Sequence, residues 1–258
     1  MVDLVRFQSR RYSPDERRCD VIILPRRFSA GFLIFLKGVF FMQTNTKNMA
    51  TAGMLCALAY IVMLVSKIFP EVAGFLQFDL KDVIIVSGGF ILGPVYAALI
   101  TVVVALVEMV TVSNTGPIGL IMNIISTGAF CCVASLVYYK KRTFWGAVSG
   151  LALGTLMLTL IMVLWNVYIT PLYMKVPRQV VISMLPTVFI PFNLVKGLIN
   201  SAFTLILYRP LVKSLTRAGL IKKSQSNSNK KFKSSAIVIG ISVLVICVPV
   251  LLHLMGVI

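Results

Sequence analysis

The chain has 258 residues, of which 58% are hydrophobic and 13% charged, and it carries a formal net charge of +17. This composition excludes a soluble globular domain and predicts an integral membrane protein of packed helices, because lipid leaves no water for unpaired backbone groups. The positive charge does not indicate nucleic-acid binding, since the basic residues lie between and beside apolar segments, where the positive-inside rule places them. No metal site is expected either, because five cysteines lack ligand spacing and only one histidine is present.

Residues 1–41 form a basic N-terminal extension that fits neither a signal peptide nor a transit peptide. Seven arginines are scattered through it without a helical period, and the acidic residues among them are atypical of a transit peptide. Two interpretations stay open. The extension is either a translated leader, with the native start at Met42 or Met49, or an ordinary basic, disordered arm.

Residues 42–215 are predicted to form one membrane domain of six helices. Their apolar segments span roughly 49–69, 82–93, 94–112, 117–139, 144–170 and 186–209. A basic, flexible linker follows at 216–235, and residues 236–258, which lack Lys, Arg, Asp and Glu, are long enough for a seventh spanning helix. The expected fold class is therefore all-α, a polytopic membrane helical bundle with six core helices and an additional C-terminal helix.

Basic clusters predict the orientation of these helices. One cluster, 140–142, separates the fourth and fifth helices, and a larger one follows the sixth, so both are expected in the cytoplasm. The loops at 71–82, 113–117 and 175–178 then lie outside a multi-pass protein of a bacterial plasma membrane.

Lys196 is the strongest candidate for a site residue. It stands in the sixth apolar segment, where a lysine near the middle of the bilayer costs roughly 2.5–3.5 kcal/mol on insertion scales and normally faces a cavity or a partner. Asn193 and Asn200 lie three residues before and four residues after it, so the three side chains share one helix face. This face would suit a polar molecule held within the membrane. The alternative is a lysine that reaches the headgroups along an apolar surface.

Other polar residues stand in apolar segments at similar depth. Glu108 in the third segment is costly unless it is paired, and Lys196 is one candidate partner, so Glu108 is either a site residue or half of a structural ion pair. Asn123 lies one to two turns into the fourth segment. Asn166 stands among aromatic residues that include Tyr173, and these form either an outer aromatic belt or a surface that stacks on a flat ring.

The first outer loop combines aromatic and acidic side chains, among them Phe78 and Asp79. It is either a gate over an outward-facing pocket or an ordinary interfacial loop.

Small residues recur at Gly53 and Ala57 in the first segment. This spacing allows another helix to approach closely in lipid. The partner is either a separate protein or a neighbouring helix of the same bundle.

The chain contains no phosphate-binding Gly-x-x-x-x-Gly-Lys-Ser/Thr sequence and no set of residues that pairs a nucleophile with a base, so neither ATP hydrolysis nor another enzymatic activity is expected.

Together these features resemble the riboflavin-specific substrate-binding (S) component of energy-coupling factor (ECF) transporters. The resemblance covers about residues 49–215. It is carried by four motifs in order, namely Gly53-x-x-x-Ala57, Phe-Leu-Gln-Phe-Asp-Leu at 75–80, Asn114-x-Gly116-Pro117 followed by Met122-Asn123, and Pro191-Phe192-Asn193-x-x-Lys196-Gly197. The C-terminal helix departs from the six-helix pattern of that family. The first 41 residues also resemble, over positions 7–18, an in-frame translation of the conserved 3′ half of an FMN riboswitch.

The resemblance implies that the chain binds riboflavin near the outer side and needs no cofactor. It also implies that the first helix, through Gly53 and Ala57, docks on a transmembrane T subunit coupled to two ATP-binding subunits. The expected substrate-binding residues are Asn193, Lys196, Asn166, Asn123, Glu108, Phe78, Asp79 and Tyr173. Alternatives are an S component for another vitamin and a stand-alone facilitator or secondary carrier. Internal inverted repeats would favour a carrier, and none is evident.

Overall fold

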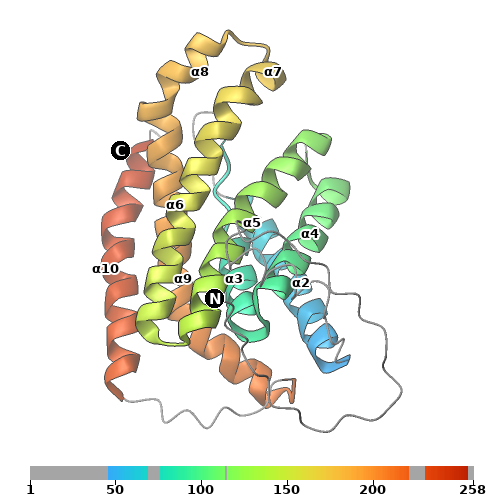
Figure 1. The fold of residues 1–258 in the computed structure, drawn as a ribbon, viewed down its shortest axis with the longest axis vertical. Helices are drawn as coiled ribbons and strands as arrows, with labels where there is room; N and C mark the ends of the chain where they lie inside the picture. The colour runs from blue at the N-terminus through green and yellow to red at the C-terminus, as the bar shows by residue number, and fades with distance from the viewer. Residues whose placement is uncertain (1–45, 69–75, 114, 221–229, 255–258) are drawn as a thin grey trace, which may run out of the picture.

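The computed structural model describes residues 46–68, 76–113, 115–220 and 230–254, and within them all regular secondary structure is helical (Figure 1). The proposed leader and much of the linker lie outside these residues. The helices are α2 (Thr46–Ser66), α3 (Lys81–Leu92), α4 (Pro94–Thr111), α5 (Gly116–Lys141), α6 (Phe144–Tyr168), α7 (Thr170–Met174), α8 (Arg178–Met184), α9 (Ile190–Arg217) and α10 (Lys230–Leu254). The predicted all-α bundle is confirmed.

Five stretches of the described chain are long and apolar enough to cross a membrane, namely α2, α4, α5, α6 and the continuous segment Arg178–Arg217. Helix α3, with 12 residues, is about 18 Å long at 1.5 Å per residue and does not span a hydrocarbon core of about 30 Å by itself. The apolar part of α10 covers Ile237–Val250. The predicted helix ends agree with the observed ones within a few residues for α2 to α6.

The sixth helix begins earlier than the sequence predicts. We expected its start near residue 186, but α8 leads directly into a π-helical turn, Leu185–Phe189, and then into α9. Pro186 occupies this wider turn. A proline within a regular α-helix removes a hydrogen bond and clashes with the preceding turn. The local change in helical pitch therefore lets one long helix continue past the proline.

The end of the first outer loop and the start of α3 are more deeply buried than the sequence predicts. Residues 71–82 were expected to form an outer loop, but Lys81 and Asp82 are each 1% exposed and Asp79 is 9% exposed. The side chain of Asn200, in the N-terminal half of α9, donates a hydrogen bond to the Asp79 carbonyl over 3.1 Å. The end of this segment therefore enters the bundle, and α3 starts inside it.

Glycines allow the central helices to approach closely. A Cβ atom at Gly150 of α6 would lie 2.7 Å from the Ala134 carbonyl oxygen of α5, and one at Gly154 would lie 2.8 Å from that of Phe130. In a membrane, where apolar burial gives no driving force between helices, such backbone proximity is a principal source of packing energy.

Helix α10 lies beside α9 at one side of the bundle (Figure 1). The two helices are antiparallel, and Cys247 of α10 is buried in a cluster that also contains residues of α9. A C-terminal helix is thus present and packed on the core domain, and its crossing of the membrane stays a prediction.

Candidate substrate-binding site

A cavity of about 330 Å³ opens where the C-terminal ends of α2, α4 and α6 meet the beginnings of α5 and α9. By the charge rule applied above, this is the outer end of the bundle. The volume lies at the lower limit of typical small-molecule sites, and the lining mixes apolar walls with a few polar groups, as such sites usually do. The polar and charged lining residues are Lys67, Gln77, Asp79, Glu108, Ser113, Thr115, Asn123, Ser126, Asn166, Thr170, Asn193 and Lys196.

Lys196 and Asn193 enter the cavity from one face of α9. Within the described part of the chain, the Lys196 ammonium makes no hydrogen bond or ion pair of ordinary length. Asn193 donates its amide to the Phe189 carbonyl over 2.8 Å, and its Oδ1 accepts no hydrogen bond from the described residues. A donor and an acceptor of α9 are therefore left for a ligand.

Asn166 reaches the cavity from α6. Its amide nitrogen donates to the Met162 carbonyl over 2.7 Å, and its Oδ1 accepts a hydrogen bond of 2.8 Å from the Thr170 hydroxyl. These two bonds fix the orientation of the amide at the point where α6 passes into α7. A ligand group can still share Oδ1, because a carbonyl oxygen has two lone pairs.

The remaining walls are apolar and partly aromatic. They consist of Leu76, Ile118, Met122, Met162, Trp165, Ile169, Tyr173, Met174 and Phe192. Aromatic rings and methionines give a surface on which a flat ring can stack, and the flexible thioethers adapt to its outline.

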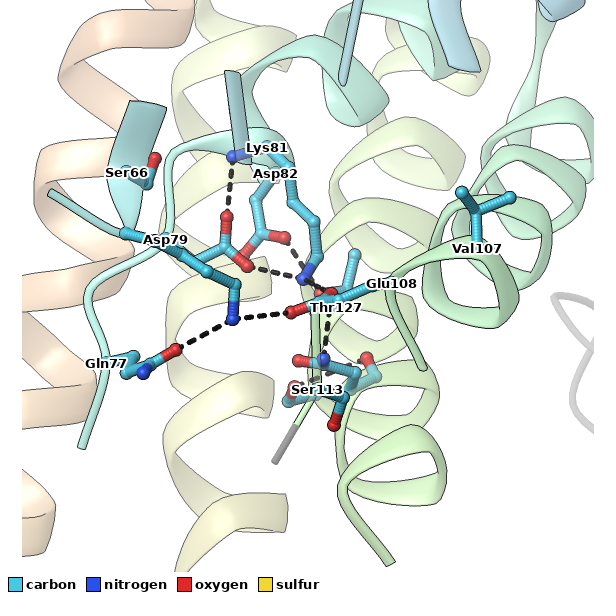
Figure 2. A network of polar contacts seen from close by, with 12 residues as sticks. Ser66, Gln77, Asp79, Lys81, Asp82, Val107, Glu108, Ser113 and Thr127 are labelled. Atoms are coloured by element: carbon cyan, nitrogen blue, oxygen red, sulfur yellow. Dashed lines mark hydrogen bonds and ion pairs between the residues drawn. The ribbon is translucent and has the colours of Figure 1, made fainter. Parts of the chain in front are cut away.

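A network of charged residues, shown in Figure 2, shares Asp79 and Glu108 with the cavity lining. The Lys81 ammonium lies 2.6 Å from Glu108 Oε2 and forms a second ion pair with the Asp79 carboxylate. The backbone nitrogen of Lys81 donates to Asp79 Oδ1 over 2.9 Å. Because Lys81 is buried and bridges two carboxylates, it joins α3, α4 and the segment before α3 at one point.

Two further residues complete the contacts of Glu108. Asn123 of α5 donates to Glu108 Oε2 over 3.0 Å, and Lys67 lies 3.6 Å from Oε1. Lys67 also donates to the Gln77 side chain over 3.1 Å. The candidate pairing of Glu108 with Lys196 is therefore wrong, because Lys81 and Lys67 are the cations that contact this carboxylate.

A second group of hydrogen bonds holds the start of α3. Asp82 accepts from Thr127 of α5 over 2.8 Å and from Asn200 of α9 over 3.3 Å. Asn200 thus bonds both Asp82 and the Asp79 carbonyl, and it lies beneath the cavity and not in its lining. This arrangement fixes the depth at which Asp79 meets the cavity.

Seven of the eight predicted site residues line this cavity, namely Asn193, Lys196, Asn166, Asn123, Glu108, Asp79 and Tyr173. Phe78 does not. Phe78 is 6% exposed and belongs to a hydrophobic cluster with Val195, Ile199 and Cys247. Asp79 therefore lies in the cavity lining, while Phe78 packs against residues of α9 and α10.

Sequence reasoning missed Lys81 and Lys67. Both stand beside the ends of apolar segments, where a lysine normally marks the membrane interface. One signal was available for Lys81, since Glu108 needed a buried cation and Lys81 lies between two acidic residues that would otherwise also be buried unpaired.

Gly53 and Ala57 are both exposed on α2, whereas Ala52 and Ala59 are buried. No described atom of another helix lies within 4 Å of a Cβ built on Gly53. Of the two interpretations of this pair, packing within the described bundle is therefore not the one observed.

A membrane-spanning helical bundle with a mixed polar and apolar cavity at one end defines a membrane protein that binds a small molecule. The chain belongs to the family of ECF transporter substrate-specific components, whose family model matches residues 47–208. It is accordingly a multi-pass protein of the cell membrane and a transport component, not an enzyme.

This chain matches relatives of known function over most of their length. The riboflavin transporter RibU of Staphylococcus aureus is 28% identical over 68% of this chain and 95% of the relative, and RibU of Streptococcus thermophilus is 29% identical over 69% of this chain and 88% of the relative. The riboflavin transporter FmnP of Bacillus subtilis is 26% identical over 63% of this chain and 90% of the relative. A solved S component of a bacterial ECF transporter matches with a TM-score of 0.56 and 28% identity, covering 67% of this chain and 99% of its own.

Proposed function

We propose that this protein is the riboflavin-binding subunit of an ECF-type uptake transporter. The observation that carries the proposal is the cavity, whose lining combines the polar side chains of Asn193, Lys196 and Asn166 with aromatic and methionine residues. The isoalloxazine ring of riboflavin needs both kinds of contact, because it has a uracil-like polar edge and an apolar dimethylbenzene edge. The names of the relatives point to the same ligand.

The side chains suit distinct parts of the ligand. The Lys196 ammonium and an asparagine amide are hydrogen-bond donors for the ring carbonyls, and Asn193 Oδ1 is an acceptor for the ring N–H. Trp165 and the methionines provide the stacking surface. Asp79, Glu108 and Asn123, which are already bonded to each other or to Lys81, are assigned to the floor of the site, and Tyr173 to its outer rim.

Delivery into the cytoplasm needs partners, because the chain contains no nucleotide-binding motif. Members of this family work with a transmembrane T component and ATP-binding subunits, and we propose two of the latter. Gly53 and Ala57 on the exposed face of α2 are the proposed contact with the T component, since small residues let helix backbones approach in lipid.

A direct test is to purify the protein from membranes of cells grown with riboflavin and to examine its absorption. We expect a yellow preparation whose flavin fluorescence is quenched by Trp165, and stoichiometric binding when riboflavin is titrated into stripped protein. Titrations with thiamine, biotin and pantothenate under the same conditions test the alternative vitamins. Tight binding of one of these without riboflavin binding would overturn the assignment.

A further inference from the structure

Helix α10 carries one continuous contact face. Among its described side chains, Gly240 and Cys247 are buried and Val243 and Leu244 are half-buried. The spacing i, i+3, i+4, i+7 places all four on one side of the helix. Neighbouring positions such as Ile241, which is 51% exposed, point away. One defined side of α10 therefore packs on the bundle, and the other sides are exposed.

The N-terminal part of this face, at Gly240, packs closely against α9. A Cβ atom on Gly240 would lie 2.8 Å from Ile206 Cγ1 and 3.1 Å from the Ala202 carbonyl oxygen. A side chain at position 240 would have to displace Ile206 or widen the gap between the two helices, so glycine favours this close packing of α10 on α9.

The C-terminal part of the face, at Cys247, packs against residues that directly precede two cavity-lining residues. Cys247 is 5% exposed and belongs to the cluster that contains Phe78, Val195 and Ile199, against which Val243 and Leu244 also pack. Phe78 directly precedes Asp79, which lines the cavity, and Val195 directly precedes Lys196. The same apolar cluster therefore supports both sides of the proposed ligand site from behind.

We propose that α10 is a positioning element for the ligand site. It holds the segment 76–80 against α9 and thereby slows the escape of the bound ligand. The ligand part of this inference rests on the riboflavin assignment above, whereas the positioning of the segment does not. The family match ends at residue 208, so α10 lies outside the matched region.

Two variants weaken the contact in different ways, and each has a control on the exposed side of the same helix. Gly240→Leu introduces bulk into the close approach, and Ser242→Leu adds the same side chain at an exposed position. Leu244→Ala removes packing without adding bulk, and Val245→Ala shortens a side chain that is 66% exposed. All four are made in the full chain and reconstituted in lipid nanodiscs.

Hydrogen exchange in the ligand-free protein tests the positioning itself. We expect amides of residues 76–82 to exchange faster in both contact variants than in the wild type, and at the wild-type rate in both controls. Unchanged exchange in folded Gly240→Leu and Leu244→Ala protein would overturn the proposal. The milder Leu244→Ala variant keeps the test decisive if the bulkier one does not fold.

Riboflavin release, followed by the recovery of flavin fluorescence, tests the consequence for the ligand. We expect release to be about tenfold faster in the contact variants, since altered affinity usually resides in the dissociation rate. Release at the wild-type rate despite faster exchange would show that α10 does not retain the ligand and would overturn that part. If the wild type binds no riboflavin, the function assigned above fails, while the exchange experiment still decides the positioning.

Discussion

Lys81 and Lys67 both contact Glu108, but their surroundings differ. The Lys81 side chain is 2% exposed and bridges two carboxylates, whereas that of Lys67 is 22% exposed and lies farther from Glu108. Removing one member of a buried ion pair leaves an uncompensated charge, which is far more costly than losing a partly hydrated pair.

We therefore expect Lys81→Met to lower the free energy of unfolding by about 3–5 kcal/mol, because Asp79 and Glu108 would lose their shared cation. The matched variant Lys67→Met should cost about 1 kcal/mol or less. Equilibrium unfolding of the ligand-free protein in detergent measures both. Equal effects of the two substitutions would contradict the bridging role of Lys81.

Lys196 and Asn193 should act on binding. We expect Lys196→Ala and Asn193→Ala each to weaken riboflavin binding by about 1–3 kcal/mol, the cost of leaving a buried polar group of the ligand without its partner. Fluorescence titration measures the affinity.

Lys213→Ala is the matched control for Lys196→Ala, because Lys213 is an exposed lysine on the same helix. Wild-type affinity in both cavity variants, with normal unfolding, would remove these residues from the site.

Among the residues, the sequence predicts polar groups within long apolar helices far better than polar groups near segment ends. Lys196, Asn193 and Asn166 were identifiable because nothing but a cavity or a partner compensates their cost in lipid. Lys81 was not, because a lysine next to a short apolar segment has the same local sequence whether it lies at the interface or inside. Phe78 was misplaced because the direction of a side chain in an irregular segment depends on tertiary packing.

At the scale of elements, the sequence predicts the ends of a helix well where charged residues or a capping residue mark them. Lys140 and Lys141 occupy the last turn of α5, and Thr143 caps α6 by accepting a hydrogen bond from the Gly146 nitrogen over 3.1 Å. The start of the sixth helix was missed because a proline ordinarily ends a helix, and the π-helical turn that accommodates Pro186 leaves no mark in the sequence.

The exposed small residues of α2 lead to a prediction about assembly. We expect Ala57→Trp to prevent association with the T component and to abolish transport, because the indole would separate the two helix backbones. Riboflavin binding should stay near the wild-type value, since Ala57 is not in the cavity lining.

Ala152→Trp is the control for this experiment, because Ala152 is also a small exposed residue but lies on α6. Co-purification with the T component and vesicle uptake give the two readouts. Lost binding with normal assembly in Ala57→Trp would place the docking surface elsewhere.

On the scale of the whole molecule, binding and energy supply are expected to be separable. Vesicles that contain this chain alone should bind riboflavin and show no ATP-dependent accumulation, because the sequence has no nucleotide-binding motif. Adding the T component and the ATP-binding subunits should establish uptake that stops when ATP is omitted. Sustained ATP-driven uptake by the single chain would contradict the proposed division of labour.

The shortness of α3 has a consequence for how the chain enters the bilayer. Helix α3 is too short to span and begins with Lys81 and Asp82, so its insertion alone would place bare charges in lipid. One residue, Gly93, separates it from α4, which carries Glu108. We therefore expect both helices to enter the bilayer as a hairpin in which Lys81 and Glu108 already form their ion pair. Lys81 and Glu108 would then enter the bilayer together as an ion pair and not as two separate charges.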